Sequence, residues 1–166
     1  MTLRVAVLGC GNSLVGNDAV GLEVLYALQE DPPRPRGLRI DFIEAATGGL
    51  DIIEYLENRD RAIVIDAILG GGRAGDIRVF DADRIPDPVD QAFSLHGIDL
   101  PHALAIGRKL HPDRMPPVTV VGIEIGKAPE PTDRDLSSAV ADAVEEAVAT
   151  VTGILADWSR EVTWDA

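Results

Sequence analysis

The stretch LRVAVLGCGNSLVGNDAVG, residues 3–21, joins an apolar run, a glycine-rich turn and the beginning of a helical pattern. Residues 3–9 are mostly apolar and end at a glycine, which is typical of a buried strand. Residues 18–29 carry apolar side chains at positions 20, 24, 25 and 28, which lie on one face of a helix. This stretch therefore predicts a strand, a tight turn and a helix, the repeating unit of an α/β fold.

The alternation of strand and helix continues along the chain. Further strands are predicted over residues 38–45, 61–67, 77–81 and 117–125, and further helices over residues 50–58, 99–110 and about 133–157. Only a short glycine-rich connection precedes residues 77–81, so we expect this strand to be antiparallel to its neighbour at one edge of the sheet. The pattern predicts a three-layer α/β sandwich with a mostly parallel five-stranded sheet and helices on both faces. We expect a single domain over residues 1–158 and a poorly ordered tail over residues 159–166.

Composition and charge exclude several classes of protein. The 166 residues have a formal net charge of −13, which argues against nucleic acid as a partner because phosphate contacts need clustered Lys and Arg. The acidity serves solubility or steers a cationic partner or metal. The single cysteine, Cys10, excludes an internal disulfide and a metal cluster built on cysteines alone. No stretch approaches the ~18 consecutive apolar residues of a membrane span. The first apolar run ends at Gly9 and does not form the apolar region of a secretory signal, so we expect a cytoplasmic protein.

The glycine-rich turn resembles a phosphate-binding loop but fails both of the familiar tests. The dinucleotide fingerprint G-x-G-x-x-G lacks its third glycine, where this chain has Leu14. The spacing from Gly11 to Gly16 matches that of a P-loop, yet Asn17 and Asp18 stand where that motif has Lys and Ser or Thr. A carboxylate at this place would repel phosphate, so a nucleotide-binding domain is a disfavoured alternative.

Three polar side chains are predicted to meet at one edge of the sheet. Ligands of open α/β sheets bind beyond the carboxyl ends of the strands, where we expect Asp18, Asp66 and His96. Each also has a simpler explanation: Asp18 could cap a helix, Asp66 could accept backbone hydrogen bonds in a turn, and His96 could be an exposed loop residue. Together, two carboxylates and an imidazole make a site for Zn, Ni, Mn or Fe with open coordination positions.

Six blocks, in this order, resemble the hydrogenase maturation proteases: VLGCGNSLVGNDAVG, ATGGLDII, IVIDA, SLHGIDLPHAL, VVGIEI and LSSAV. The resemblance runs from residue 4 to about residue 150. It implies a five-stranded twisted sheet between helices and an endopeptidase that removes the C-terminal extension of a [NiFe] hydrogenase large-subunit precursor after nickel insertion.

The same resemblance implies the roles of the three site residues. It assigns the family's metal-binding and catalytic positions to Asp18, Asp66 and His96. The metal is expected to be the substrate's own nickel, so that the free enzyme is metal-empty. The family often has two acids in a row where this chain has Asn17 and Asp18, so one negative charge is absent while Asp18 still fills the matching ligand position.

Two groups of loop residues are candidates for substrate contact. The first is Asn12 and Asn17 in the glycine-rich turn. The second is Thr47, Gly48 and Gly49, which form either a peptide-binding loop or an ordinary helix-start turn.

Other mechanisms are disfavoured by the sequence. Cys10 could act as a nucleophile with His96 as its base, but it has apolar neighbours and no nearby positive charge to lower its pKa. Ser13 and Ser94 lie in no nucleophile-elbow motif. A nickel-binding maturation chaperone without proteolytic activity stays open as the alternative function.

Overall fold

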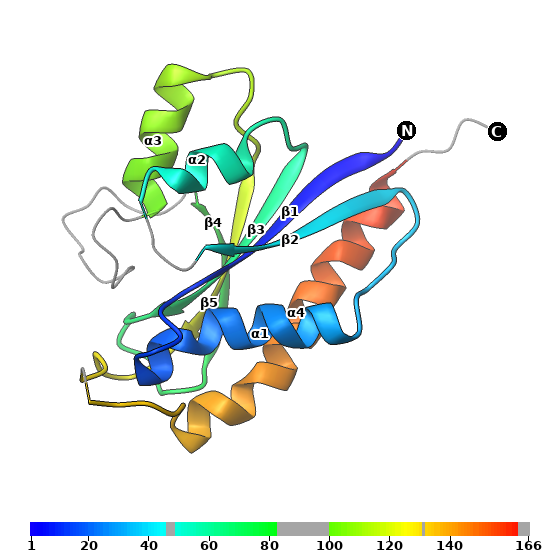
Figure 1. The fold of residues 1–166 in the computed structure, drawn as a ribbon. Helices are drawn as coiled ribbons and strands as arrows, with labels where there is room; N and C mark the ends of the chain where they lie inside the picture. Colours follow the sequence, from blue (N-terminus) through cyan, green and yellow to red (C-terminus); the bar gives the residue numbers. More distant parts are fainter. Residues whose placement is uncertain (46–48, 83–99, 131, 163–166) are drawn as a thin grey trace.

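The computed structural model describes residues 1–45, 49–82, 100–130 and 132–162, and within them the chain forms one five-stranded sheet (Figure 1). The strands are β1 (Leu3–Cys10), β2 (Leu38–Ala45), β3 (Arg61–Ile68), β4 (Ile77–Asp81) and β5 (Val118–Glu124). Their spatial order is β2-β1-β3-β5-β4. All neighbouring pairs are parallel except β4 with β5, which is antiparallel at the edge. The predicted fold class is confirmed.

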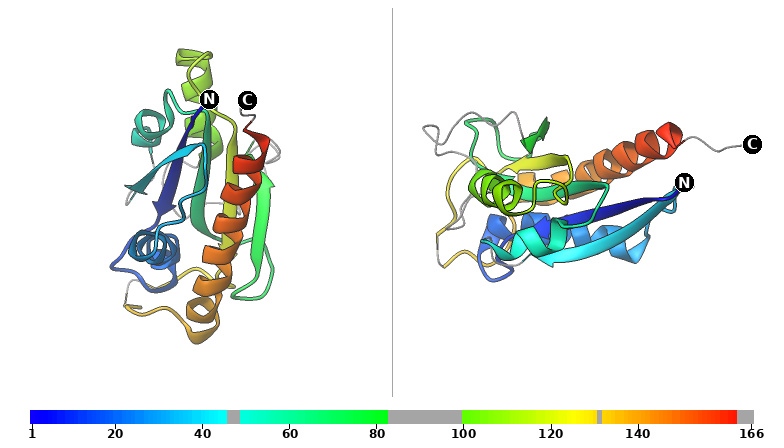
Figure 2. Two further views of the ribbon diagram at one scale, coloured as in Figure 1. Left: turned by 90° about the vertical axis from the view of Figure 1, so that its right-hand side faces the viewer. Right: turned by 90° about the horizontal axis from the view of Figure 1, so that it is seen from above.

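Helices cover both faces of this sheet (Figures 1 and 2). The helical elements are a short 3₁₀ turn η1 (Gly16–Ala19), α1 (Val20–Glu30), α2 (Asp51–Leu56), α3 (Leu100–Leu110) and α4 (Ser138–Glu161). Side chains of α1 and α4 pack on one face, and side chains of α2 and α3 pack on the other. None of the helices in the described ranges is both long enough and apolar enough to cross a lipid bilayer.

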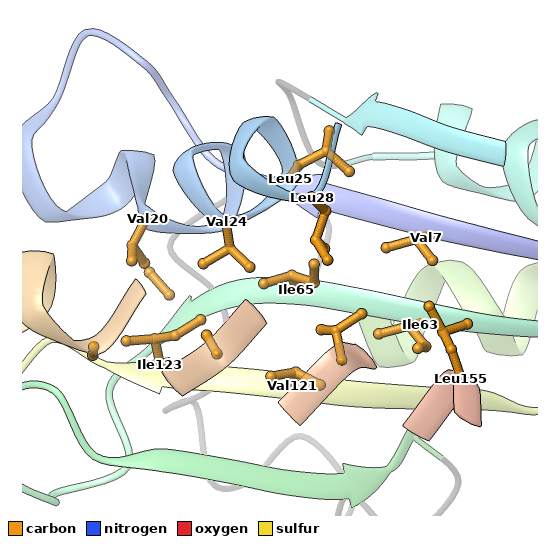
Figure 3. Close-up of a cluster of buried hydrophobic side chains, with 14 of the residues drawn as sticks. Val7, Val20, Val24, Leu25, Leu28, Ile63, Ile65, Val121, Ile123 and Leu155 are labelled. Atoms are coloured by element: carbon orange, nitrogen blue, oxygen red, sulfur yellow. The ribbon is translucent and has the colours of Figure 1, made fainter. Parts of the chain in front are cut away.

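The larger core lies between the sheet and the α1–α4 layer (Figure 3). It is built from fully buried aliphatic side chains of both layers: Val7, Val20, Val24, Leu25, Leu28, Ile63, Ile65, Val121, Ile123 and Leu155. The helical spacing seen in the sequence produces this face of α1, and burial of each Val, Leu or Ile side chain contributes about 1.5–3 kcal/mol. The central strands are therefore fixed firmly beneath the helices.

The opposite face of the sheet carries the residues of chemical interest. Successive side chains of a strand alternate between the two faces. In β1, Val5 and Val7 join the larger core, whereas Leu8 and Cys10 join the smaller core under α2 and α3. By the same alternation in β3, Asp66 shares the face of Cys10.

The last helix extends further than the sequence predicted. It begins at Ser138 and continues to Glu161, so the expected tail over residues 159–166 is wrong for residues 159–161 and the domain boundary at 158 is too early. Residues 163–166 lie outside the described ranges. The reason is tertiary, because Arg61 pairs with Glu161 and lies 5.2 Å above the ring of Trp158.

Candidate active site

The glycine-rich turn between β1 and η1 is closed by hydrogen bonds within itself. The backbone N–H of Asn12 donates to the carbonyl of Asp18 (3.3 Å), and the N–H of Asp18 donates to the carbonyl of Val15 (3.0 Å). The N–H of Val15 donates to the Asn12 carbonyl (3.1 Å), and the N–H of Leu14 donates to Asn12 Oδ1 (3.0 Å). These amides are occupied inside the chain, so they do not form a phosphate cradle. Asn12 stabilises the turn.

The glycines of this region permit close packing of the chain on itself. A Cβ on Gly9 would lie 2.6 Å from the Gly21 carbonyl oxygen, and a Cβ on Gly21 would lie 2.2 Å from that of Cys10. Gly11 has φ +143°, and its Cβ would lie 2.1 Å from the carbonyl oxygen of Asp18. Only glycine fits at such distances. The motif therefore seats the start of α1 directly on the strands.

Asp18 lies in this turn with its side chain enclosed by protein. It is the third residue of η1 and is only 4% exposed. The helix α1 has Ala19 at its N-cap, so Asp18 is not the N-cap residue of this helix. A carboxylate is costly to bury unless hydrogen bonds or a cation compensate for its lost hydration.

Asp66 is the second enclosed carboxylate, at 8% exposure. The sequence placed it at the end of a strand predicted over residues 61–67, and β3 continues one residue further, to Ile68. The strand continues because residues 66–68 pair with β5, and Ile68 fills the space above Gly122. Asp66 Oδ1 accepts a hydrogen bond from the N–H of Ala67 (2.8 Å), so the backbone-bonding alternative is met in part. Being bonded to one amide does not prevent a carboxylate from binding a cation.

The topology brings the two carboxylates to the same part of the sheet. The strands β1 and β3 are neighbours, with Gly9 opposite Ile65, so Cys10 and Asp66 follow side by side. The turn η1, which carries Asp18, contacts β3. A Cβ on Gly21 would lie 2.5 Å from the Ile65 carbonyl oxygen, which places the beginning of α1 over this strand end. These contacts place the turn that carries Asp18 against the strand that carries Asp66.

Cys10 lies beside Asp66 but is poorly suited to act as a nucleophile. Burial raises the pKa of its thiol well above the ordinary value, and the negative charge of Asp66 raises it further. The reactive form of cysteine is the thiolate, which is disfavoured here. This environment is consistent with the prediction that Cys10 is a core residue and not a nucleophile.

Several predicted site residues fall elsewhere or outside the described residues. His96, Thr47 and Gly48 lie outside them, so their predicted roles stay predictions. Gly49 has φ +137° and its carbonyl accepts the N–H of Ile52 (3.4 Å), which fits a helix-start turn. Within the four described ranges, no group of three His, Cys, Asp or Glu side chains could hold a metal ion.

Asn17 has a structural contact that the sequence could not reveal. Its Oδ1 accepts a hydrogen bond from the backbone N–H of Ser137, at 2.7 Å. The two residues are 120 positions apart. The side chain of Asn17 thus ties the turn to the segment that precedes α4.

Glu124 is a buried carboxylate that sequence reasoning did not single out. It is fully buried near the end of β5. Its Oε2 accepts the N–H groups of Gly70 (2.7 Å) and Gly72 (3.2 Å), and its Oε1 accepts that of Gly126 (3.2 Å). The sequence signal for this arrangement is the set of glycines that follow β3, in LGGGRAG, and β5, in IEIG. Glu124 fixes two loops.

Comparison with known proteins identifies the family to which this chain is similar. Residues 22–154 match the family described as hydrogenase maturation protease. A putative hydrogenase maturation protease of Methanocaldococcus jannaschii is 29% identical over 153 residues, covering 90% of this chain and 94% of that protein. The hydrogenase 2 maturation protease of Escherichia coli is 27% identical over 104 residues, covering 62% of each chain.

A solved structure extends the likeness to the fold. The hydrogenase maturating endopeptidase HybD from E. coli superposes with a TM-score of 0.78 at 26% identity, covering 94% of both chains. The fold is that of an α/β protein with a mostly parallel sheet, and folds of this class bind ligands at the carboxyl edge of the sheet.

The chain belongs to the hydrogenase maturation protease family, and its relative HybD is described as an endopeptidase. The prediction of an enzyme of this type is confirmed at the level of the family.

Cys10 makes the stability of the fold sensitive to alkaline pH. The folded pKa of its thiol is raised, so the folded state keeps its proton above the unfolded pKa of about 8.5, while the unfolded state loses it. Its contribution to stability is therefore present below that pH and declines above it. Compared with Cys10→Ala, the wild type should lose about 1.4 kcal/mol of unfolding free energy per pH unit from about pH 9 upward. Urea unfolding of both proteins measures this, and parallel pH curves would contradict it.

Asp66→Asn should make the free protein slightly more stable. The asparagine keeps Oδ1 as an acceptor for the N–H of Ala67 and removes one of two neighbouring buried negative charges. We expect the unfolding free energy to rise by about 1 kcal/mol, equivalent to less than one pKa unit of repulsion. Urea unfolding at pH 7 tests this, with exposed Asp142→Asn on α4 as the matched control. A clear loss of stability would assign Asp66 a structural role.

Proposed function

We propose that this protein is the endopeptidase that removes the C-terminal extension of a [NiFe] hydrogenase large-subunit precursor after nickel has been inserted. The observation that carries the proposal is the pair of buried carboxylates, Asp18 and Asp66, which different elements bring to one sheet edge. Membership of the family supplies the reaction class. The alternative, a nickel-binding maturation chaperone without proteolysis, uses the same site without cleavage.

In this proposal the nickel ion belongs to the substrate. A precursor that already holds the ion presents it at the sheet edge, where Asp18 and Asp66 complete its coordination. Carboxylate oxygens bind divalent cations well, and binding offsets the cost of burying two charges. His96, the third residue implied by the family resemblance, completes the same ligand set. A precursor without nickel lacks the atom that joins the two proteins.

The chemistry requires activation of either the scissile carbonyl or a water molecule. A bound divalent ion can polarise a carbonyl oxygen, or lower the pKa of a bound water so that it attacks at neutral pH. The buried thiol of Cys10 is not needed for either route. The role of Asp18 and Asp66 is to hold the substrate so that its cleavage site lies beside the ion.

The proposal predicts nickel-dependent processing that requires both carboxylates. Chelator-treated enzyme should shorten nickel-loaded precursor and leave nickel-free precursor intact, as followed by mass spectrometry of the product. Asp18→Asn and Asp66→Asn should lower the rate at least about 100-fold, because a misplaced or missing ligand removes the productive geometry. Asp142→Asn should process at the wild-type rate.

Three results would contradict the proposal. Efficient cleavage of nickel-free precursor would remove the role of the ion and return attention to Cys10. Wild-type rates for a folded Asp18→Asn enzyme would remove the role of that carboxylate. Nickel-dependent binding of the precursor without any cleavage would favour the chaperone.

A further inference from the structure

The turn that carries Asp18 is held from outside by the segment before α4. Three residues of this turn, Leu14, Gly16 and Asn17, contact that segment. The Asn17 Oδ1 atom accepts the N–H of Ser137 at 2.7 Å, and the carbonyl of Leu14 accepts Nη1 of Arg134 at 2.9 Å. Gly16, at φ +40°, packs so closely that a Cβ would lie 2.8 Å from the Cβ of Asp133.

The segment is itself anchored to the core. Ser137 is the N-cap residue of α4 and the carbonyl of Ser137 accepts the N–H of Ala141 (2.9 Å). The buried face of this helix begins at Val140 and continues along its length to Trp158. A rigid path therefore runs from the sheet through α4 and Ser137 to Asn17, the residue directly before Asp18.

The turn needs such an external support. It contains glycines at positions 11 and 16 with positive φ, and glycine gives the backbone more freedom than any other residue. Its own closing bond, from Asn12 to the Asp18 carbonyl, is long at 3.3 Å. A ligand residue must keep its place to a fraction of an ångström to act in a reaction.

We propose that Asn17 and Arg134 are positioning residues that hold Asp18 in the geometry needed to meet the substrate. This inference rests on the proposed function for its effect on processing. It assigns Asn17 a hydrogen-bonding role within the enzyme, in place of the substrate contact predicted from the sequence. It also makes the segment 133–137, distant in sequence from every predicted site residue, part of the machinery.

The first test is kinetic. Asn17→Leu removes the acceptor while keeping a similar volume, and should lower kcat for nickel-loaded precursor at least about tenfold with little change in KM. Asn17→Asp keeps an acceptor oxygen and should stay within about threefold of the wild type. Exposed Gln29→Leu on α1, which replaces an amide away from this turn, is the matched control. Arg134→Ala should show a smaller loss and cannot empty a core position, because Arg134 is exposed.

The second test does not depend on activity. The Asp18 amide donates to the Val15 carbonyl, so its hydrogen exchange reports how firmly the turn is held. In Asn17→Leu this amide should exchange about tenfold faster, while Val24 in α1 keeps its wild-type rate.

The outcomes separate this inference from the proposed function. If the wild type fails to process the precursor, the proposed function is wrong and exchange at Asp18 alone decides the positioning role. Wild-type exchange at Asp18 in both Asn17→Leu and Arg134→Ala would overturn the inference. A lower kcat with unchanged exchange would also overturn it, since substrate contact would then explain the loss.

Discussion

The close seating of α1 on the ends of β1 and β3 is the constraint on which the rest of the site depends. Carbonyl oxygens of Cys10 and Ile65 lie where a side chain on Gly21 would have to be. Gly9 and Gly11 remove the corresponding obstacles on the other side of the turn. Because the backbone approaches so closely, the turn η1 that precedes α1 is drawn inward, and its residue Asp18 is buried at the carboxyl edge of the sheet. The glycine-rich motif thus permits α1 to pack closely on the strands, and this packing encloses the carboxylate of Asp18.

Buried charge gives this arrangement its chemical character. Glu124 shows one solution, in which three backbone N–H groups surround a fully buried carboxylate and fix two loops. Asp18 and Asp66 lie at the edge where α/β proteins bind ligands, and a cation brought by the substrate would be attracted to both. Burial, and after it the negative charge of Asp66, raises the pKa of Cys10 and keeps that thiol protonated. The enclosed, negatively charged surroundings therefore favour binding of a cation and disfavour thiolate chemistry.

Much of the fold was predictable because its signals are local. The apolar runs are buried on both faces over residues 5–9 and 62–67, and the short connection before β4 correctly predicted an antiparallel edge. The predicted ends of β3 and α4 differ from the structure where contacts with residues distant in sequence extend these elements. Ile68, the one residue of β3 beyond the predicted strand, pairs with Glu124 of β5, and Glu161 at the end of α4 pairs with Arg61. For the site, the strand pattern predicted that Asp18 and Asp66 lie at the carboxyl edge of the sheet, whereas the bond from Asn17 to Ser137 links residues 120 apart and leaves no local trace.

Direct contact between the buried carboxylates and the substrate's nickel is the central claim of this account. X-ray absorption at the nickel edge tests it most directly, on nickel-loaded precursor alone and on its complex with the enzyme frozen before cleavage. The account predicts additional oxygen neighbours of nickel in the complex, and their loss when the enzyme carries Asp18→Ala together with Asp66→Ala. An unchanged nickel spectrum in a complex that goes on to cleave its substrate would contradict it.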